Sequence, residues 1–169
     1  RISCKTYSGI YLMLKIVLST LLLVTSAHSL ELKIVNPCEK TLILKESLPN
    51  NGETIGKIST DIFTKYNYQF EASEFGVAQL LNSPIGIDAM EVISDTVMRA
   101  HGWCYSINGE VPELLMNEIV ADESIKTVVW FMGYSTYVGN MQTGEHEWIG
   151  QCIPTNELAS NPFPSYCQQ

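Results

Sequence analysis

The sequence lacks the short motifs that mark most metal, nucleotide and serine-nucleophile sites. It has no C-x-x-C or H-x₃-H spacing, which argues against a zinc site. It has no glycine-rich phosphate loop and no dinucleotide-binding fingerprint. Residues 133–135 (GYS) begin like a nucleophile elbow, but Tyr137 stands where the G-x-S-x-G pattern needs its second glycine. We therefore expect no metal, no cofactor and no catalytic serine.

Long apolar runs are also missing. The main one, over residues 16–24, falls well short of the roughly 20 apolar residues that span a bilayer. Lys15 precedes it, and small residues (Ala27 and Ser29) stand three and one positions before Leu30. This order is typical of a secretory signal peptide. We expect Met13 to be the true start, residues 1–29 to be removed, and no membrane insertion after cleavage.

Positive charge is scarce, with 10 Lys and Arg against 18 Asp and Glu. The expected mature chain, residues 30–169, keeps 7 of the basic residues and all 18 acidic ones, a net charge of −11. Such a surface repels phosphate backbones, so we expect neither nucleic acid nor anionic lipid as a partner. The same charge helps to keep a protein in solution.

Four cysteines remain in the expected mature chain. An even number in an exported domain predicts two disulfides and a periplasmic or secreted location. We expect Cys104 to pair with Cys152, because both lie on predicted strands of one sheet, and Cys38 to pair with Cys167, because chain termini often lie close together. The alternative pairs Cys152 with Cys167 and Cys38 with Cys104.

Residues 30–169 contain no internal repeat, low-complexity stretch or linker, which predicts a single domain. Apolar residues at 55, 58, 62 and 63 fit one face of a helix that Thr54 caps and that ends near residues 66–67. The order of a strand, a helix and a series of mostly antiparallel strands predicts an α+β fold, with one helix packed on a mixed sheet. We expect strands over residues 40–47, 68–71, 89–94, 98–108, 127–132 and 146–153, with turns at 49–52, 83–86 and 108–109 and an aperiodic tail from 154.

Two segments carry a resemblance to a known family. Residues 102–109 (GWCYSING) are followed by Pro112 and, about twenty residues later, by residues 129–134 (VWFMGY). This pattern resembles the domain of unknown function 4430 family, also called the transcobalamin-like C-terminal domain, in its proteobacterial exported branch. Residues 106–109 take the place of the family's S-V-N-G-like turn, and Trp130 takes that of the tryptophan in its later strand.

The resemblance covers roughly residues 41–152 and implies a β-grasp-like fold, in which a sheet grips one helix. The sequence departs from the family at residues 122–124 (DES), where a glycine-aspartate turn is expected, and at Phe131, where a charged residue is expected. In transcobalamin-type proteins the domain covers a bound corrinoid together with a helical domain. The expected mature chain has no room for such a domain, so we expect no tight binding of cobalamin.

Two groups of residues could carry chemistry. His101 and Cys104 suggest a catalytic dyad, but residues three apart on a strand point to opposite faces. Residues 145–147 (EHE) could bind a metal, but on a strand His146 would oppose the two glutamates, and we interpret the segment as a solvated hairpin end. We therefore expect no enzyme.

Aromatic residues are the strongest candidates for ligand contacts, because rings offer a large contact area and a polar edge. Strand aromatics usually pack on neighbours in the sheet, and we assign Trp103, Tyr105 and Trp130 to the core. Tyr134, Tyr137 and Trp148 lie toward the hairpin end, where function is more common, and these three are the predicted ligand-binding residues.

These observations favour an exported, non-catalytic binding module that recognises a small molecule, a glycan or a protein through the hairpin end of its sheet. The alternative is a structural or interaction protein of the cell envelope, or an inhibitor, that pairs an exposed sheet edge with a partner strand. A concave aromatic pocket near Tyr134 would favour the first, and a long uncovered edge strand would favour the second.

Overall fold

The computed structural model describes residues 29–39, 41–140 and 142–168. The predicted signal peptide therefore lies outside the described residues, except for Ser29. Within the described part, no helix is long and apolar enough to cross a membrane. The elements are β1 (Ser29–Val35), β2 (Leu42–Pro49), α2 (Ile55–Lys65), β3 (Phe70–Ser73), β4 (Gly76–Leu80), η1 (Gly86–Ala89), β5 (Met90–Ser94), β6 (Val97–Ile107), β7 (Thr127–Gly139), β8 (His146–Pro154), η2 (Thr155–Glu157) and α3 (Pro164–Cys167).

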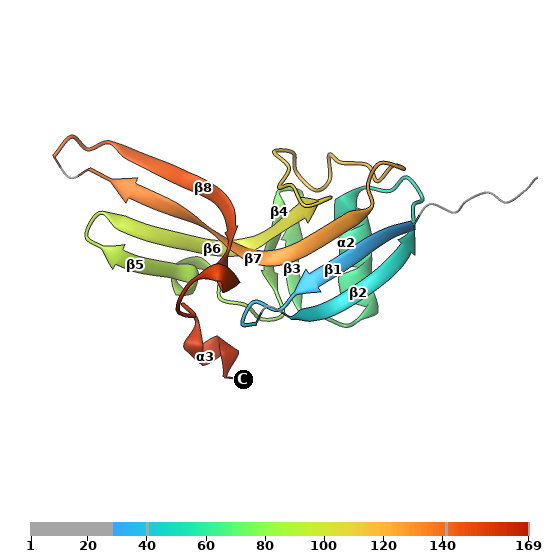
Figure 1. The fold of residues 1–169 in the computed structure, drawn as a ribbon, viewed down its shortest axis with the longest axis horizontal. Coiled ribbons are helices and arrows are strands. Elements are labelled where there is room, and N and C mark those ends of the chain that lie inside the picture. The colour runs from blue at the N-terminus through green and yellow to red at the C-terminus, as the bar shows by residue number, and fades with distance from the viewer. Residues whose placement is uncertain (1–28, 40, 141, 169) are drawn as a thin grey trace, which may run out of the picture.

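The main sheet is mixed and is built around β7 (Figure 1). Its order is β2-β1-β7-β6-β5, and β8 also pairs with β7. β1 runs parallel to the first part of β7, from Thr127 to Trp130, whereas β8 runs antiparallel to its second part, from Gly133 to Gly139. One edge of β7 thus pairs with two strands in succession. The predicted α+β class with a mixed sheet is confirmed.

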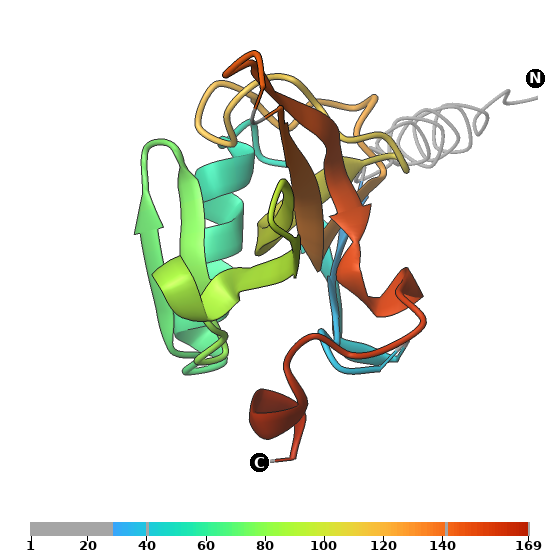
Figure 2. The same ribbon diagram turned by 90° about the vertical axis from the view of Figure 1, so that its left-hand side faces the viewer.

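A helix and a small hairpin cover one face of this sheet, here called the inner face (Figure 2). α2 packs its buried side chains Ile55, Ile58, Ile62 and Phe63 against the sheet, which is the face that the sequence predicted. Thr54 accepts a hydrogen bond from the amide of Lys57, as expected of the cap. The β3–β4 hairpin lies beside α2 on the same side.

Trp130 is the centre of the inner core. Its side chain is fully buried, lies 5.7 Å from the ring of Phe63 in an edge-on arrangement, and donates a hydrogen bond to the hydroxyl of Ser59 on α2. Trp103 on β6 is also buried and donates to the hydroxyl of Ser83. Each indole N–H therefore has a partner, as buried polar groups require. Both tryptophans lie in the core, as the sequence predicted, and Tyr105 packs on Trp130 at 5.2 Å.

Several strands differ from their predicted bounds. β1 and β4 were not predicted, β3 begins two residues later than expected, and β7 runs on from residue 132 to Gly139. β1 alternates buried Leu30, Leu32 and Ile34 with more exposed residues, because only its inner face is covered. The extension of β7 passes beyond α2, and residues 134–139 are only partly buried.

The two disulfides join the predicted pairs. Cys38 is bonded to Cys167 with the Cα atoms 5.5 Å apart, and Cys104 is bonded to Cys152 with the Cα atoms 5.8 Å apart. The first bond connects the loop after β1 to α3 near the end of the chain. The second connects β6 to β8, two strands that lie on opposite sides of β7 in the sheet.

Candidate ligand site on the outer sheet face

The face of β6 and β7 that points away from α2, here called the outer face, is lined by small residues. Ala100 is opposite Ser135 in the β6–β7 register, and Gly102 is opposite Gly133. These four residues share one face because side chains alternate along each strand. They form a low floor between larger neighbours, and nothing lies within 4 Å of the place where Gly102 would carry a Cβ atom.

A bulge in β8 builds the wall beside this floor. Tyr134 pairs with Ile153, and Thr136 pairs with Ile149, so residues 150–152 of β8 stand opposite Ser135 alone. Two of these residues have positive φ angles, 69° at Gly150 and 54° at Cys152. Extra residues in one strand bend it and turn its side chains to new directions. The bulge turns this part of β8 onto the outer face of β7.

The Cys104–Cys152 disulfide fixes the bulge in place. The bond passes from β8 to β6 directly over Gly133. A Cβ atom at Gly133 would lie 2.9 Å from Sγ of Cys104 and 3.0 Å from Cα of Cys152, which is closer than side chains normally approach. Glycine at this position therefore allows the crossing. Cys152 keeps an uncommon backbone conformation for a residue with a side chain, and its cross-link to Cys104 on β6 holds it there.

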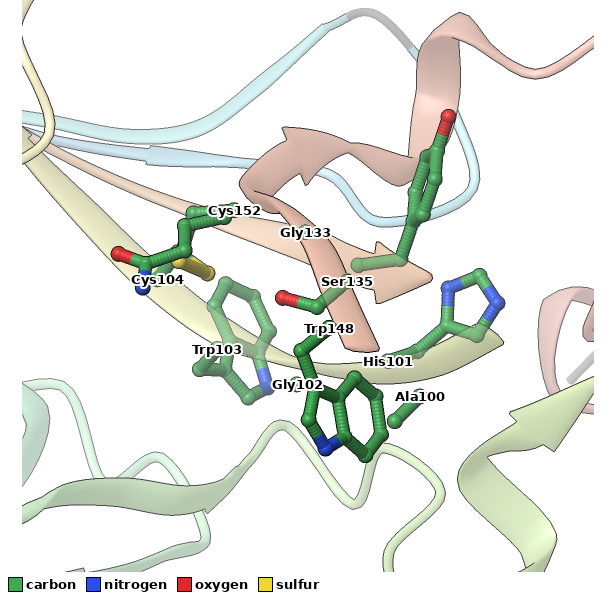
Figure 3. A pocket seen from close by; sticks show the side chains of 11 residues that line it. Ala100, His101, Gly102, Trp103, Cys104, Gly133, Ser135, Trp148 and Cys152 are labelled. Carbon is green, nitrogen blue, oxygen red and sulfur yellow. A yellow bond between two sulfur atoms is a disulfide. The ribbon is translucent and has the colours of Figure 1, made fainter. Parts of the chain in front are cut away.

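Floor and wall border a hollow of about 600 Å³ that is widely open to solvent (Figure 3). This volume lies within the range of small-ligand pockets. The indole of Trp148, on β8, stands over the floor near Gly102 and Ala100, and 53% of its surface is exposed. The complete lining is Ala100, His101, Gly102, Trp103, Cys104, Gly133, Tyr134, Ser135, Trp148, Gln151 and Cys152, and it includes no Asp, Glu, Lys or Arg.

Aromatic rings continue from the hollow toward the tip of the β7–β8 hairpin. Tyr137 is paired with Trp148 across the two strands, and their rings lie 5.3 Å apart in an edge-on arrangement. The ring of His146 stacks on Tyr137 at 5.7 Å. Two of the three predicted ligand-binding residues, Tyr137 and Trp148, are thus neighbours on the outer face.

Tyr134 is on the other side of the sheet. It borders the hollow, but it is an even-numbered residue of β7, like the inward-pointing Trp130, and alternation places its ring on the inner face. There the ring lies 5.5 Å from that of His101, and the guanidinium of Arg99 sits 5.0 Å from its centroid. The three predicted residues therefore do not form a single cluster.

His101 belongs to a polar chain on the inner face. Its Nδ1 lies 3.0 Å from the hydroxyl of Thr155, and its Nε2 lies 3.4 Å from a carboxylate oxygen of Glu91, which also pairs with Arg99 at 3.1 Å. Burial lowers the pKa of His101 below its usual 6.5, and the contact with Glu91 only partly opposes this shift. His101 and Cys104 lie on opposite faces, as predicted, so they form no dyad.

The order hydroxyl, imidazole, carboxylate resembles that of a catalytic triad. The side chain of His101 has no exposed surface, however, and Thr155 is only 2% exposed. Phe163 of the tail packs edge-on against the imidazole at 4.9 Å. A substrate cannot reach this hydroxyl, and the chain instead ties β5, β6 and η2 together.

Some residues of the hollow were not singled out from the sequence. Gln151 owes its place to the bulge, which no local pattern predicts. The floor left a readable signal, because small residues recur with period two in both strands, at 100 and 102 and at 133 and 135. Residues 145–147 are exposed, and among the described residues no three His, Cys, Asp or Glu side chains gather closely enough to hold a metal ion.

Comparisons with known proteins give little further information. No protein-family model and no curated protein sequence matches the chain. A similar solved structure is that of a protein from Ruminococcus gnavus ATCC 29149 described as a "putative metal binding protein", with 10% sequence identity and a TM-score of 0.42. The match covers 63% of this chain and 98% of that chain. At this TM-score the similarity carries no argument about this protein.

Proposed function

We propose that the protein is an exported, non-catalytic binding module whose ligand site is the hollow beside Trp148. The observation that carries this proposal is the half-exposed indole standing over a floor of small residues. An exposed indole beside a low floor offers a large, rigid contact surface, and a stacking ligand would bury both the ring and the floor.

The lining favours an uncharged ligand with one flat, apolar face. No Asp, Glu, Lys or Arg side chain lines the hollow, so a charged group of a ligand would lose part of its hydration without gaining an oppositely charged partner. Ser135 and Gln151 supply a hydroxyl and an amide that can bond polar groups at the edge of such a ligand. The net charge of the whole chain, −8, disfavours anionic ligands further.

Absence of catalysis is part of the proposal. The polar chain of Thr155, His101 and Glu91 lies on the inner face, away from the floor and Trp148, and its hydroxyl is closed to solvent. Among the described residues, no hydrogen bond joins the hydroxyl of Ser135 on the floor to a base. An activated nucleophile requires such a bond.

We also propose that the protein is exported. Two disulfides are typical of proteins that fold in an oxidising compartment, which fits a periplasmic or secreted location. We also propose a β-grasp-like fold related to the transcobalamin-like C-terminal domain, since the mixed sheet packs on α2, the long helix of the described residues.

The test is ligand binding by matched variants of the exported, oxidised protein. A panel of neutral saccharides and neutral aromatic compounds is titrated by calorimetry, whose signal does not depend on the presence of Trp148. We expect Trp148→Ala to weaken binding at least about tenfold, the effect of losing one buried aromatic contact. Ile149→Ala is the matched control, because Ile149 is the next residue of the same strand and is 46% exposed. Equal affinity in both variants would remove the hollow as the site.

A second function is favoured by the edge of the sheet at β5. Among the described strands β5 pairs with β6 alone, and Val92 and Ile93 are 76% and 47% exposed. Such an edge can accept a partner strand through its free backbone groups. Under this function Val92→Pro would abolish capture of an envelope protein, whereas Trp148→Ala would leave that capture unchanged.

A further inference from the structure

A second hollow lies on the outer face next to the first. Its volume is about 360 Å³, and Cys152 lines both hollows. Its floor comes from Val129 and Phe131 of β7 and Ser106 of β6, which continue the outward-pointing rows that begin at Ser135 and Ala100. Asn156 and Glu157 of η2 stand on one side of it, and the start of the 110–126 loop, at Val111, stands on another.

The two hollows are arranged along the strands, with the Cys104–Cys152 bridge between them. On β6 the outward residues run from Ala100 in the first hollow to Ser106 in the second. Six residue steps of about 3.3 Å make this distance roughly 20 Å. A single ring stacked on Trp148 cannot reach the second hollow, whereas a linear ligand can lie in both.

The chemistry of the lining repeats from one hollow to the other. Each combines apolar surface with hydroxyl and amide groups: Ser135 and Gln151 in the first, Ser106 and Asn156 in the second. The second hollow differs in having the carboxylate of Glu157 at one side, which can accept hydrogen bonds from sugar hydroxyls. Alternating apolar and hydrogen-bonding surface complements a chain of sugar rings, whose faces are apolar and whose rims carry hydroxyls.

An extended peptide fits this surface poorly. A bound peptide strand must satisfy its backbone N–H and C=O groups, and it normally does so at a free sheet edge. β6 is paired with β5 and β7, and β7 is paired with β6 on one side and with β1 and β8 on the other. The floor formed by β6 and β7 therefore offers a peptide no open backbone edge.

We infer that the ligand is a linear, neutral oligosaccharide that lies along both hollows and crosses the Cys104–Cys152 bridge, with one ring stacked on Trp148. This inference rests on the proposed function. It assigns the second hollow as a subsite that only longer chains reach, with Asn156 as a hydrogen-bonding residue and Val111 at its rim.

The test compares ligand lengths. Oxidised protein is titrated with neutral oligomers of glucose and of N-acetylglucosamine, from one ring to six, by calorimetry. We expect affinity to rise at least about tenfold between the shortest oligomer that binds and the six-ring oligomer. Val111→Trp, which fills the second hollow, should reduce the affinity for the long oligomer to that for the short one. Asn156→Ala should weaken the long oligomer alone by roughly three- to tenfold, as expected for one lost hydrogen bond.

Val120→Trp is the matched control, because Val120 lies in the same loop as Val111, is similarly exposed, and does not line the second hollow. It should leave all affinities unchanged. Binding that depends on Trp148 but is equal for short and long oligomers, or unaffected by Val111→Trp and Asn156→Ala, would overturn the inference and leave the proposed function standing. No binding of any neutral oligomer, together with Trp148-dependent binding of an aromatic compound, would also overturn it. The proposed function itself falls only if no neutral compound binds at Trp148.

Discussion

At the scale of single residues, the candidate site depends on side chains that are small or absent. Gly102 and Gly133 face each other across β6 and β7 on the same outer surface, yet their surroundings differ. Gly102 has open space above it, and this space is part of the hollow. Gly133 lies under the disulfide, and the space that a side chain would need is filled by Cys104 and Cys152.

This difference predicts opposite outcomes for two alanine variants. Gly133→Ala should destabilise the oxidised protein by roughly 1–3 kcal/mol, the usual cost of overpacking, because neither the bridge nor the β8 backbone can move freely. Gly102→Ala should leave stability equal or slightly higher, since glycine within a strand is unfavourable. Urea unfolding of both variants measures the effect. If the two variants unfold at the same urea concentration, the bridge does not press on Gly133.

Residue-scale prediction from the sequence succeeded where a pattern had a physical period. The helix face of Ile55, Ile58 and Ile62 follows from such a period, and the burial of Trp130 follows from the tendency of strand aromatics to pack on sheet neighbours. Ligand contact by Tyr134 stays a prediction, since this residue borders the hollow. Counting in twos from the buried Trp130 adds that its ring lies on the inner face, beside His101.

At the scale of elements, β8 decides whether a site exists. The sequence predicted a strand over residues 146–153 that partners β7, and this is confirmed. The bulge at residues 150–152 was not predicted, because its positive φ angles are imposed by a bond to a distant strand rather than by local sequence, except at Gly150. A regular β8 would lie flat beside β7 and leave no wall around the floor.

The bridge should therefore matter more for binding than the other disulfide does. Removing it by Cys104→Ser with Cys152→Ser should cost roughly 4 kcal/mol of stability for a 48-residue separation, and should release the bulge and weaken binding at Trp148. Removing Cys38–Cys167 should cost about 5 kcal/mol for a 129-residue separation but leave the affinity for a one-ring ligand at Trp148 unchanged, because neither cysteine lines the first hollow. Calorimetric titration of both double variants, at a temperature where each is folded, compares them. Equal losses of affinity would contradict the role of the bulge.

At the scale of the whole molecule, segments that are far apart in the sequence meet at two places. One is the inner core, where α2 meets Trp130 and β1. The other is the polar chain around His101, where β5, β6, β7 and the tail converge through Glu91, Tyr134, Thr155 and Phe163. The class of the fold could be predicted from the order of elements, but this convergence could not, since the tail has no periodic pattern.

The buried imidazole gives the whole molecule a pH-dependent stability. Burial keeps His101 neutral and lowers its pKa in the folded protein, whereas the unfolded chain titrates near 6.5. Just below pH 6.5 the unfolded state therefore binds more protons than the folded state, and stability falls as the pH falls until it passes the folded pKa. Above pH 6.5 both states are neutral at this residue, and its full contribution is present.

Unfolding midpoints measured between pH 8 and pH 5 should therefore be level at first and then decline below about 6.5. His101→Gln keeps a hydrogen-bonding group between Thr155 and Glu91 but does not titrate, and should abolish the decline. Three carboxyl groups also have lowered pKa values: Glu31, Glu46 and Asp122. Their contribution to the stability of the protein is lost mainly below their usual pKa values of 4.5, 4.5 and 3.8, so it does not obscure this window. His146→Gln is the control, because His146 is exposed at the hairpin end, and it should retain the decline. If the unfolding midpoint of His101→Gln declines with the same slope, a group other than His101 causes the pH dependence of stability.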